Sequence, residues 1–324
     1  MPHRIAKTIY NEIIKADKIL LVCHQNPDGD ALGSVSALGY FLNGINKIYN
    51  NFCLTKPSHK LNSLPHLMSL SADPQIWEQK HDLIIVLDSG DLDYAGVAKY
   101  INKLNHDPII VNIDHHASNN RFGQHNLVIT TASATTEILY QFFKYNNIII
   151  NKNMAVALLT GLITDTENFS NPGTTINSLK IASELIHQGA NFNLVKTWFI
   201  RDKSISALKL WGSALSRLTK HKTLDIIYTY ITHQDIIEHG VSDIESEGIA
   251  NYLNNLNEGR AALILKEMPN GKIKGSFRTT HNDVDVSQMA QALGGGGHKK
   301  ASGFTLDGTI ETAFEQIWST LAKV

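Results

Sequence analysis

One short stretch near the N-terminus carries an imidazole and two carboxylates. The segment 24–30, HQNPDGD, supplies His24, Asp28 and Asp30, and it follows an apolar run at 19–22 that predicts a buried strand. Two carboxylates two residues apart repel each other and favour a cation between them. The alternative is a polar turn in which an Asp caps the next helix. This loop alone leaves both interpretations open.

The same arrangement recurs along the chain. Apolar runs end at Asp88 and at Asp114, and the second is followed at once by His115 and His116. A longer apolar segment of helical character ends at Asp165. If these elements are parallel neighbours, their acidic ends converge at one edge of a sheet, where ligands bind in α/β proteins. The recurrence favours a metal cluster over chance.

Four of the candidate ligands are carboxylates, and their four negative charges balance the charge of two divalent cations. Oxygen and imidazole donors without a thiolate favour Mn²⁺ or Mg²⁺ over structural zinc, and Mn²⁺ accepts imidazole more readily. Two such ions about 4 Å apart clamp a phosphoryl group for in-line attack. The sequence therefore predicts a two-metal phosphoryl-transfer site, with Mn²⁺ as the first choice and Mg²⁺ as the second. The predicted ligands are His24, Asp28, Asp30, Asp88, His115 and Asp165.

Two residues beside the predicted ligands have expected supporting roles. His116 would contact a phosphate oxygen or the leaving oxygen and act as a catalytic group. Asp114 either orients a ligating histidine, as carboxylates behind a metal site do, or is a buried acid satisfied by backbone N–H groups.

A second candidate site lies near the C-terminal end. A run of four glycines followed by His298 allows backbone to approach a ligand closely and presents N–H groups to an anion. Arg278, at the end of a predicted strand, would form paired hydrogen bonds with a terminal phosphate. The alternative is a flexible turn with solvated lysines. The predicted substrate-binding residues are Arg278, Gly295, Gly296, Gly297, His298 and Ser302.

Composition restricts the class of protein and of partner. The 324 residues carry a net charge of −1, whereas proteins that bind long nucleic acids usually carry an excess of basic residues. A nucleic-acid substrate should therefore be short. Two cysteines do not form a disulfide framework, and no apolar run approaches the roughly 20 residues of a membrane span. We expect a cytoplasmic protein that does not enter the membrane; the sequence leaves its oligomeric state, monomer or homodimer, open.

The predicted elements change character along the chain. In residues 1–190 strands alternate with helices, which predicts an α/β domain with a mostly parallel sheet flanked by helices. Residues 191–220 are expected to be a linker with a bridging helix at 203–219. Residues 221–324 predict a smaller α+β domain, with a hairpin turn at 269–271. We expect the two domains to face each other across a cleft.

Three motifs resemble those of the DHH phosphoesterase superfamily, and they follow one another along the chain in the same order as in the superfamily. The segment 112–119, NIDHHASN, is similar to the superfamily signature, and 24–31, HQNPDGDA, resembles its first motif. The segment 294–303, GGGGHKKASG, is similar to the glycine motif of the DHH-associated C-terminal domain. The resemblance covers nearly the whole chain.

The resemblance implies a division of the ligands between two metals. His24, Asp28 and Asp88 would hold one ion. Asp88 would bridge to the second ion, which would be held by Asp30, Asp88, His115 and Asp165.

Within the superfamily the chain resembles the bacterial nanoRNase and pAp-phosphatase group. This implies hydrolysis of very short oligonucleotides and dinucleotides such as pApA to 5′-mononucleotides, and of pAp to AMP. A pyrophosphatase or polyphosphatase and a catalytically silent nucleotide-binding regulator are the alternatives. Two departures put substrate preference in doubt: Tyr94 stands where these relatives often have arginine, and Glu167 where they often have glycine.

Overall fold

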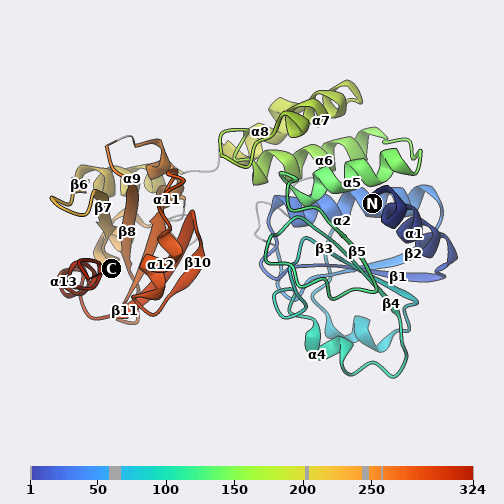
Figure 1. The fold of residues 1–324 in the computed structure, drawn as a ribbon, viewed down its shortest axis with the longest axis horizontal. Coiled ribbons are helices and arrows are strands. Elements are labelled where there is room, and N and C mark those ends of the chain that lie inside the picture. The colour runs from blue at the N-terminus through green and yellow to red at the C-terminus, as the bar shows by residue number, and fades with distance from the viewer. Residues whose placement is uncertain (1, 58–66, 201–203, 243–247, 257, 324) are drawn as a thin grey trace. The chain divides into compact units, whose positions relative to one another are not determined.

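The computed structural model describes residues 2–57, 67–200, 204–242, 248–256 and 258–323. The chain divides into two compact units, Met1–Arg201 and Asp202–Val324 (Figure 1). Within the described ranges, no helix combines the length and apolar character that a membrane span requires.

The first unit is built on a five-stranded parallel sheet. Its strand order is β2-β1-β3-β4-β5, so the first, third and fourth strands in the chain are neighbours at its centre. Every pairing between these strands is parallel. Their carboxyl ends therefore meet at one edge. The strands are β1 (Lys18–Cys23), β2 (Ile48–Phe52), β3 (Leu83–Leu87), β4 (Ile109–Asp114) and β5 (His125–Val128).

Helices cover both faces of this sheet. Alternate residues of β1 point to opposite faces: Leu21 and Cys23 join one buried cluster, and Leu20 and Val22 join the other. Figure 1 shows α2, α5 and α6 on one face and α4 on the other. The helices are α1 (Pro2–Lys15), α2 (Gly29–Gly44), η1 (Pro74–Glu78), α4 (Ala98–Ile101), α5 (Thr135–Tyr145), α6 (Lys152–Asp165), α7 (Ile176–His187) and α8 (Phe192–Ile200).

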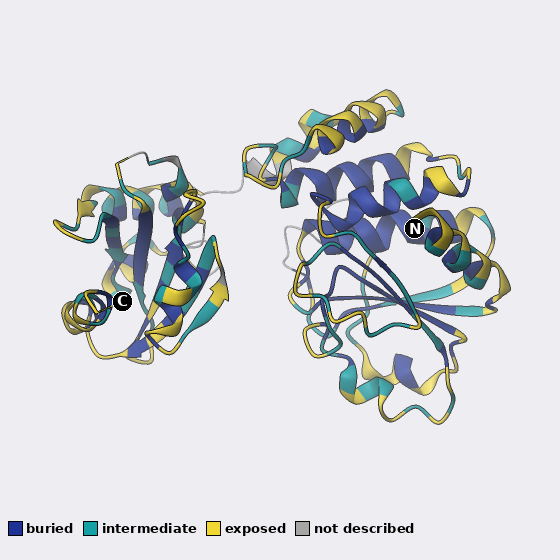
Figure 2. Cartoon of the chain, in the orientation of Figure 1, coloured by how far each residue is buried: buried dark blue, intermediate teal, exposed yellow. Residues whose placement is uncertain are grey.

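Two glycines let α2 and α6 pack closely. A Cβ on Gly33 would lie 2.5 Å from the carbonyl oxygen of Ala157, and a Cβ on Gly161 would lie 2.4 Å from Oδ1 of Asp30. Side chains at these positions would force the helices apart. The contact buries most of α2 (Figure 2) and brings Asp30 at its start close to Asp165 at the end of α6.

The second unit contains a six-stranded mixed sheet. Its order is β10-β11-β9-β8-β7-β6, with β7 and β8 parallel and the other neighbours antiparallel. The predicted hairpin joins β8 to β9, and Gly271 in its turn has φ of 73°. The strands are β6 (Thr219–Lys220), β7 (Ile226–Ile231), β8 (Ala261–Glu267), β9 (Lys272–Arg278), β10 (Gly296–His298) and β11 (Ala301–Asp307). The helices are α9 (Ile205–Ser216), α10 (His233–His239), α11 (Ile249–Tyr252), η2 (Leu253–Asn255), α12 (Val286–Gln291) and α13 (Ile310–Leu321).

The predicted fold classes are confirmed for both units. The segment expected to be a linker with a bridging helix, 191–220, is arranged differently: α8 belongs to the first unit and α9 to the second. The helix α9 is shorter than the 203–219 expected, and its Ala207, Leu210 and Ala214 are buried in a cluster with residues of β7 and β8. This burial makes α9 part of the second unit's core.

Candidate metal centre

The ends of three neighbouring strands supply the centre of the site. His24 follows β1, Asp88 follows β3 and His115 follows β4, and these strands are adjacent in the sheet. Asp88 leaves its strand with φ of 57°, in the left-handed region that costs a non-glycine residue about 1 kcal/mol or more. Its backbone N–H still donates to the carbonyl of Ile113 on β4. The turn places the carboxylate between the two histidines.

The two oxygens of Asp88 face different histidines. Oδ2 lies 3.6 Å from Nε2 of His24, and Oδ1 lies 3.8 Å from Nε2 of His115. Two donors that bind one ion at about 2.1 Å each lie roughly 3 Å or slightly more apart. The observed spacings therefore leave room for a cation on each side of Asp88.

The remaining predicted ligands complete two groups. Oδ1 of Asp28 lies 3.8 Å from Nε2 of His24, and Oδ2 of Asp165 lies 3.3 Å from Nε2 of His115. The ligand atoms of each group lie within 4.8 Å of one another. The structure thus brings all six predicted ligands together. One group contains His24, Asp28 and Asp88, and a second contains Asp30, His115 and Asp165. A third group contains Asp88, His115 and His116.

Asp28 caps a helix, which is one of the two roles considered from the sequence, and it also lies beside a second predicted ligand. Its Oδ1 accepts hydrogen bonds from the backbone N–H groups of Asp30 (2.9 Å) and Ala31 (3.1 Å), which caps α2. The same carboxylate faces His24. The cap fixes its position at the rim of the cluster.

Crowding of the carboxylates changes their acidity. Burial and the charges of Asp88 and Asp28 raise the pKa of Asp30 well above its usual value. Burial and the charges of Asp30 and Asp88 likewise raise the pKa of Asp165 to about 10. Ionised carboxylates are therefore costly here without positive charge beside them. Two divalent cations would neutralise the four carboxylates, so the donor set fits such a pair.

The start of α5 supports the ligands, and sequence reasoning missed this contribution. Asp30 is fully buried and accepts the backbone N–H of Thr135 (2.6 Å) and both the backbone N–H (3.0 Å) and hydroxyl (2.7 Å) of Thr136. The hydroxyl of Thr135 also donates to Oδ1 of Asp88 at 2.9 Å. A pair of threonines at a helix start suggests capping, and only the fold reveals what they hold.

Asp114 forms a hydrogen bond with His116, which is not one of the six predicted metal ligands. Its Oδ1 accepts from Nδ1 of His116 at 2.7 Å, and its Oδ2 accepts from Nδ2 of Asn119 at 2.6 Å. Burial lowers the pKa of His116, but the hydrogen bond to Asp114 and the charge of Asp88 outweigh it and raise the pKa to about 9. Asp114 is itself fully buried, so the pair fixes the His116 ring at the edge of the cluster.

The predicted substrate-binding residues fall on both faces of the second sheet. The strand pairing aligns Gly296 with Gly303 and Gly303 with Ser276, and side chains alternate along β9. Gly296, Ser276 and Arg278 therefore share one face. Nε of Arg278 donates to Oδ1 of Asn251 at 2.8 Å. The two residues line a pocket of about 260 Å³.

Three of the other predicted residues are in close contact with neighbouring parts of the second unit. Ser302 is buried, and its hydroxyl donates to the carbonyl of Val286 at 2.6 Å, on the face opposite Arg278. A Cβ on Gly297 would lie 2.6 Å from Cα of Ser302, and a Cβ on Gly295 would lie 2.2 Å from the carbonyl oxygen of Gly303. Ser302 is therefore held against the start of α12, and neither Gly295 nor Gly297 has room for a side chain.

Gly296 and His298 differ from those three residues. A Cβ on Gly296 would meet no atom within 4 Å, so packing does not explain this glycine. The backbone of His298 pairs with Ala301, and its side chain lies outside the described residues.

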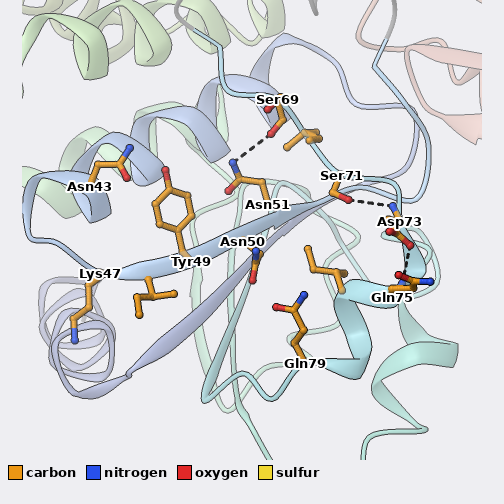
Figure 3. Close-up of a pocket in the computed structure, with 13 residues that line it drawn as sticks. Asn43, Lys47, Tyr49, Asn50, Asn51, Ser69, Ser71, Asp73, Gln75 and Gln79 are labelled. Atoms are coloured by element: carbon orange, nitrogen blue, oxygen red, sulfur yellow. Dashed lines mark hydrogen bonds between the residues drawn. The ribbon is translucent and has the colours of Figure 1, made fainter.

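A groove of about 760 Å³ lies elsewhere on the first unit, along β2. Figure 3 shows amide and hydroxyl side chains around it, including Asn50, Asn51 and Ser71. The Lys47 ammonium is bound to the backbone carbonyls of Ile14 and Ala16. The groove contains none of the predicted site residues.

Two family models match the chain. The model of the DHH family, N-terminal domain, matches residues 18–162, and the model of the DHHA1 domain matches residues 224–323. The chain therefore contains a DHH-family N-terminal domain and a DHHA1 domain. Its two matched regions fall in the two compact units of the structure.

Two relatives extend over almost the whole chain. The Thermus thermophilus protein named bifunctional oligoribonuclease and PAP phosphatase NrnA is 28% identical over 310 residues, 94% of this chain and 90% of that protein. The Bacillus subtilis protein of the same name is 26% identical over 90% of each chain. The crystal structure of an exopolyphosphatase-related protein from Bacteroides fragilis aligns with a TM-score of 0.90 at 25% identity, covering 99% of this chain and 96% of that one.

The hydrogen bond from the Thr135 hydroxyl to Asp88 can be tested by substitution. Thr135→Val removes the hydroxyl that holds Asp88 and keeps the side-chain shape. Because groups behind a metal site orient its ligands, we expect Mn²⁺ affinity to fall about tenfold or more in calorimetric titration. Thr8→Val is the control, since the Thr8 hydroxyl bonds only within α1, to the carbonyl of Arg4. Unchanged Mn²⁺ affinity in Thr135→Val would contradict this role.

Proposed function

We propose that this protein is a metal-dependent phosphoesterase that hydrolyses very short oligoribonucleotides and dinucleotides to 5′-mononucleotides, and also pAp to AMP. The observation that carries the proposal is the position of Asp88, with one carboxylate oxygen toward His24 and the other toward His115. The relatives named oligoribonuclease and PAP phosphatase, which align with nearly the whole chain, support the substrate class.

The ligands would hold two divalent cations, with Mn²⁺ as the first choice. His24, Asp28 and Asp88 would hold one ion, and Asp88 would be shared with the second. When bound, the pair would polarise the phosphoryl oxygens and supply a water nucleophile at neutral pH. The second ion's ligands would be Asp30, Asp88, His115 and Asp165.

His116 would act on the leaving oxygen. Its Nδ1 is bound to the buried Asp114, which leaves Nε2 to donate a proton to the departing alkoxide. The hydrogen bond to Asp114 favours the protonated ring that this role requires. Asp114 is a positioning residue in this scheme, because it fixes the tautomer and the direction of the imidazole.

The second unit would bind an anionic end of the substrate. Arg278 is held by Asn251, which orients the guanidinium for paired hydrogen bonds to a phosphate. The open position at Gly296 would let a ligand approach the backbone on the same face. Recognition by a few local contacts agrees with the net charge of −1.

The proposed function is tested by comparing three substrates with Mn²⁺: pApA, pAp and pyrophosphate. We expect AMP release from pApA to be fastest, with slower release from pAp. Fastest hydrolysis of pyrophosphate would favour the pyrophosphatase alternative and contradict the role given to the second unit. Absence of turnover with Mn²⁺ bound would favour the silent regulator.

Gly296→Ala tests whether the second unit binds substrate. The added methyl group meets no protein atom, so stability should not change. If a ligand approaches the backbone there, KM for pApA should rise severalfold with kcat nearly constant. Steady-state kinetics and thermal unfolding are the measurements. Gly212→Ala in α9, where a Cβ also meets nothing within 4 Å, is the matched control. Wild-type KM in Gly296→Ala would exclude this contact.

A further inference from the structure

An aromatic side chain lies directly against the metal centre. The ring of Tyr94 stacks on that of His24, with centroids 5.1 Å apart and an interplanar angle of 23°. It also meets the ring of His116 in a T-shaped arrangement, with centroids 6.4 Å apart and an interplanar angle of 67°. Tyr94 is therefore in ring contact with one predicted ligand and with the proposed proton donor.

The backbone around Tyr94 fixes the ring in this place. Its N–H donates to Oδ1 of Asp91 at 2.6 Å, and its carbonyl accepts the N–H of Gln25, the neighbour of His24, at 3.3 Å. The next residue, Ala95, is fully buried. The loop after β3 is thus anchored to the loop after β1, and the phenol is held at the rim of the cluster.

Tyr94 nevertheless remains 46% exposed. Stacking on His24 occupies one part of the ring, while close to half of the residue faces solvent beside a cluster of carboxylates. Burial of this exposed part by a ligand would stabilise the complex, since burial is the main source of an aromatic ring's stabilising effect. The exposed part offers an apolar π-surface next to the place where a phosphoryl group would be attacked.

We infer that Tyr94 is a stacking platform for a nucleobase adjacent to the scissile phosphate. This inference rests on the proposed function, which places a nucleotide phosphate between the ligands. Aromatic stacking accepts every base, because each base has a π-face, and it strengthens binding of single-stranded nucleic acid. Tyr94 would therefore favour nucleotides over pyrophosphate and other phosphates without a base, without selecting among bases.

A purely structural role makes a different prediction. If Tyr94 only orients His24, its loss should weaken Mn²⁺ binding and affect every substrate equally. If it stacks on a base, its loss should affect only substrates that carry that base. The two roles are separated by substrates from which one base has been removed.

The experiment compares pApA with two analogues in which either the first or the second adenine is replaced by hydrogen. For Tyr94→Leu we expect KM for pApA to rise about tenfold, with Mn²⁺ affinity and kcat nearly unchanged. For one of the two analogues, KM should be the same in the wild type and in Tyr94→Leu. Tyr94→Trp, which restores an aromatic surface, should recover the lower KM. Tyr145→Leu, which removes a 37% exposed tyrosine at the end of α5, is the control.

Several results would overturn the inference. These are an equal rise of KM for pApA and both analogues, a loss of Mn²⁺ affinity that accounts for the kinetic change, or no change at all in Tyr94→Leu. Each leaves the proposed function intact if the wild type hydrolyses pApA. If the wild-type protein with Mn²⁺ does not hydrolyse pApA, the proposed function fails and the inference falls with it.

Discussion

Repulsion among four carboxylates, held together at the carboxyl end of a parallel sheet, is the constraint on which the site depends. Asp30 and Asp88 are almost completely buried, and burial together with the neighbouring charges raises the pKa values of Asp30 and Asp165. Proteins retain such an arrangement at a cost in stability, and the cost is offset when cations bind. Asp88 lies at the centre because its two oxygens face the two histidines, His24 and His115.

The surrounding fold holds these charges in place through contacts that carry no chemistry themselves. Close packing of α2 against α6 at Gly33 and Gly161 brings Asp30 and Asp165 together from segments far apart in the sequence. The N–H groups at the start of α5 hold Asp30, as helix N-termini hold anions. Asp114 fixes His116 from behind the sheet edge. The site is therefore preorganised by the same elements that form the core.

Much of this was predictable because the ligands follow apolar runs. The runs before Asp88 and Asp114 predict buried strands, and parallel neighbours bring their ends together. The partners of Asp30 were not predictable, since Thr135 and Thr136 act through backbone geometry and a long-range contact. Strand register could not be predicted from the sequence either, and it is the register that places Ser302 on the face opposite Arg278. The edge strand β5, with His125 and Asn126 among its four residues, lacks the apolar run that would have predicted it.

The number of Mn²⁺ ions bound per chain, in the wild type and in Asp88→Asn, tests the central claim most directly. Calorimetric titration should give two ions for the wild type. In Asp88→Asn both should bind much more weakly, because a neutral amide replaces the carboxylate that both ions would share. Asp73→Asn, which keeps an oxygen for the cap of η1, should bind two ions like the wild type. A single ion in the wild type, or two ions with wild-type affinity in Asp88→Asn, would contradict the shared role of Asp88.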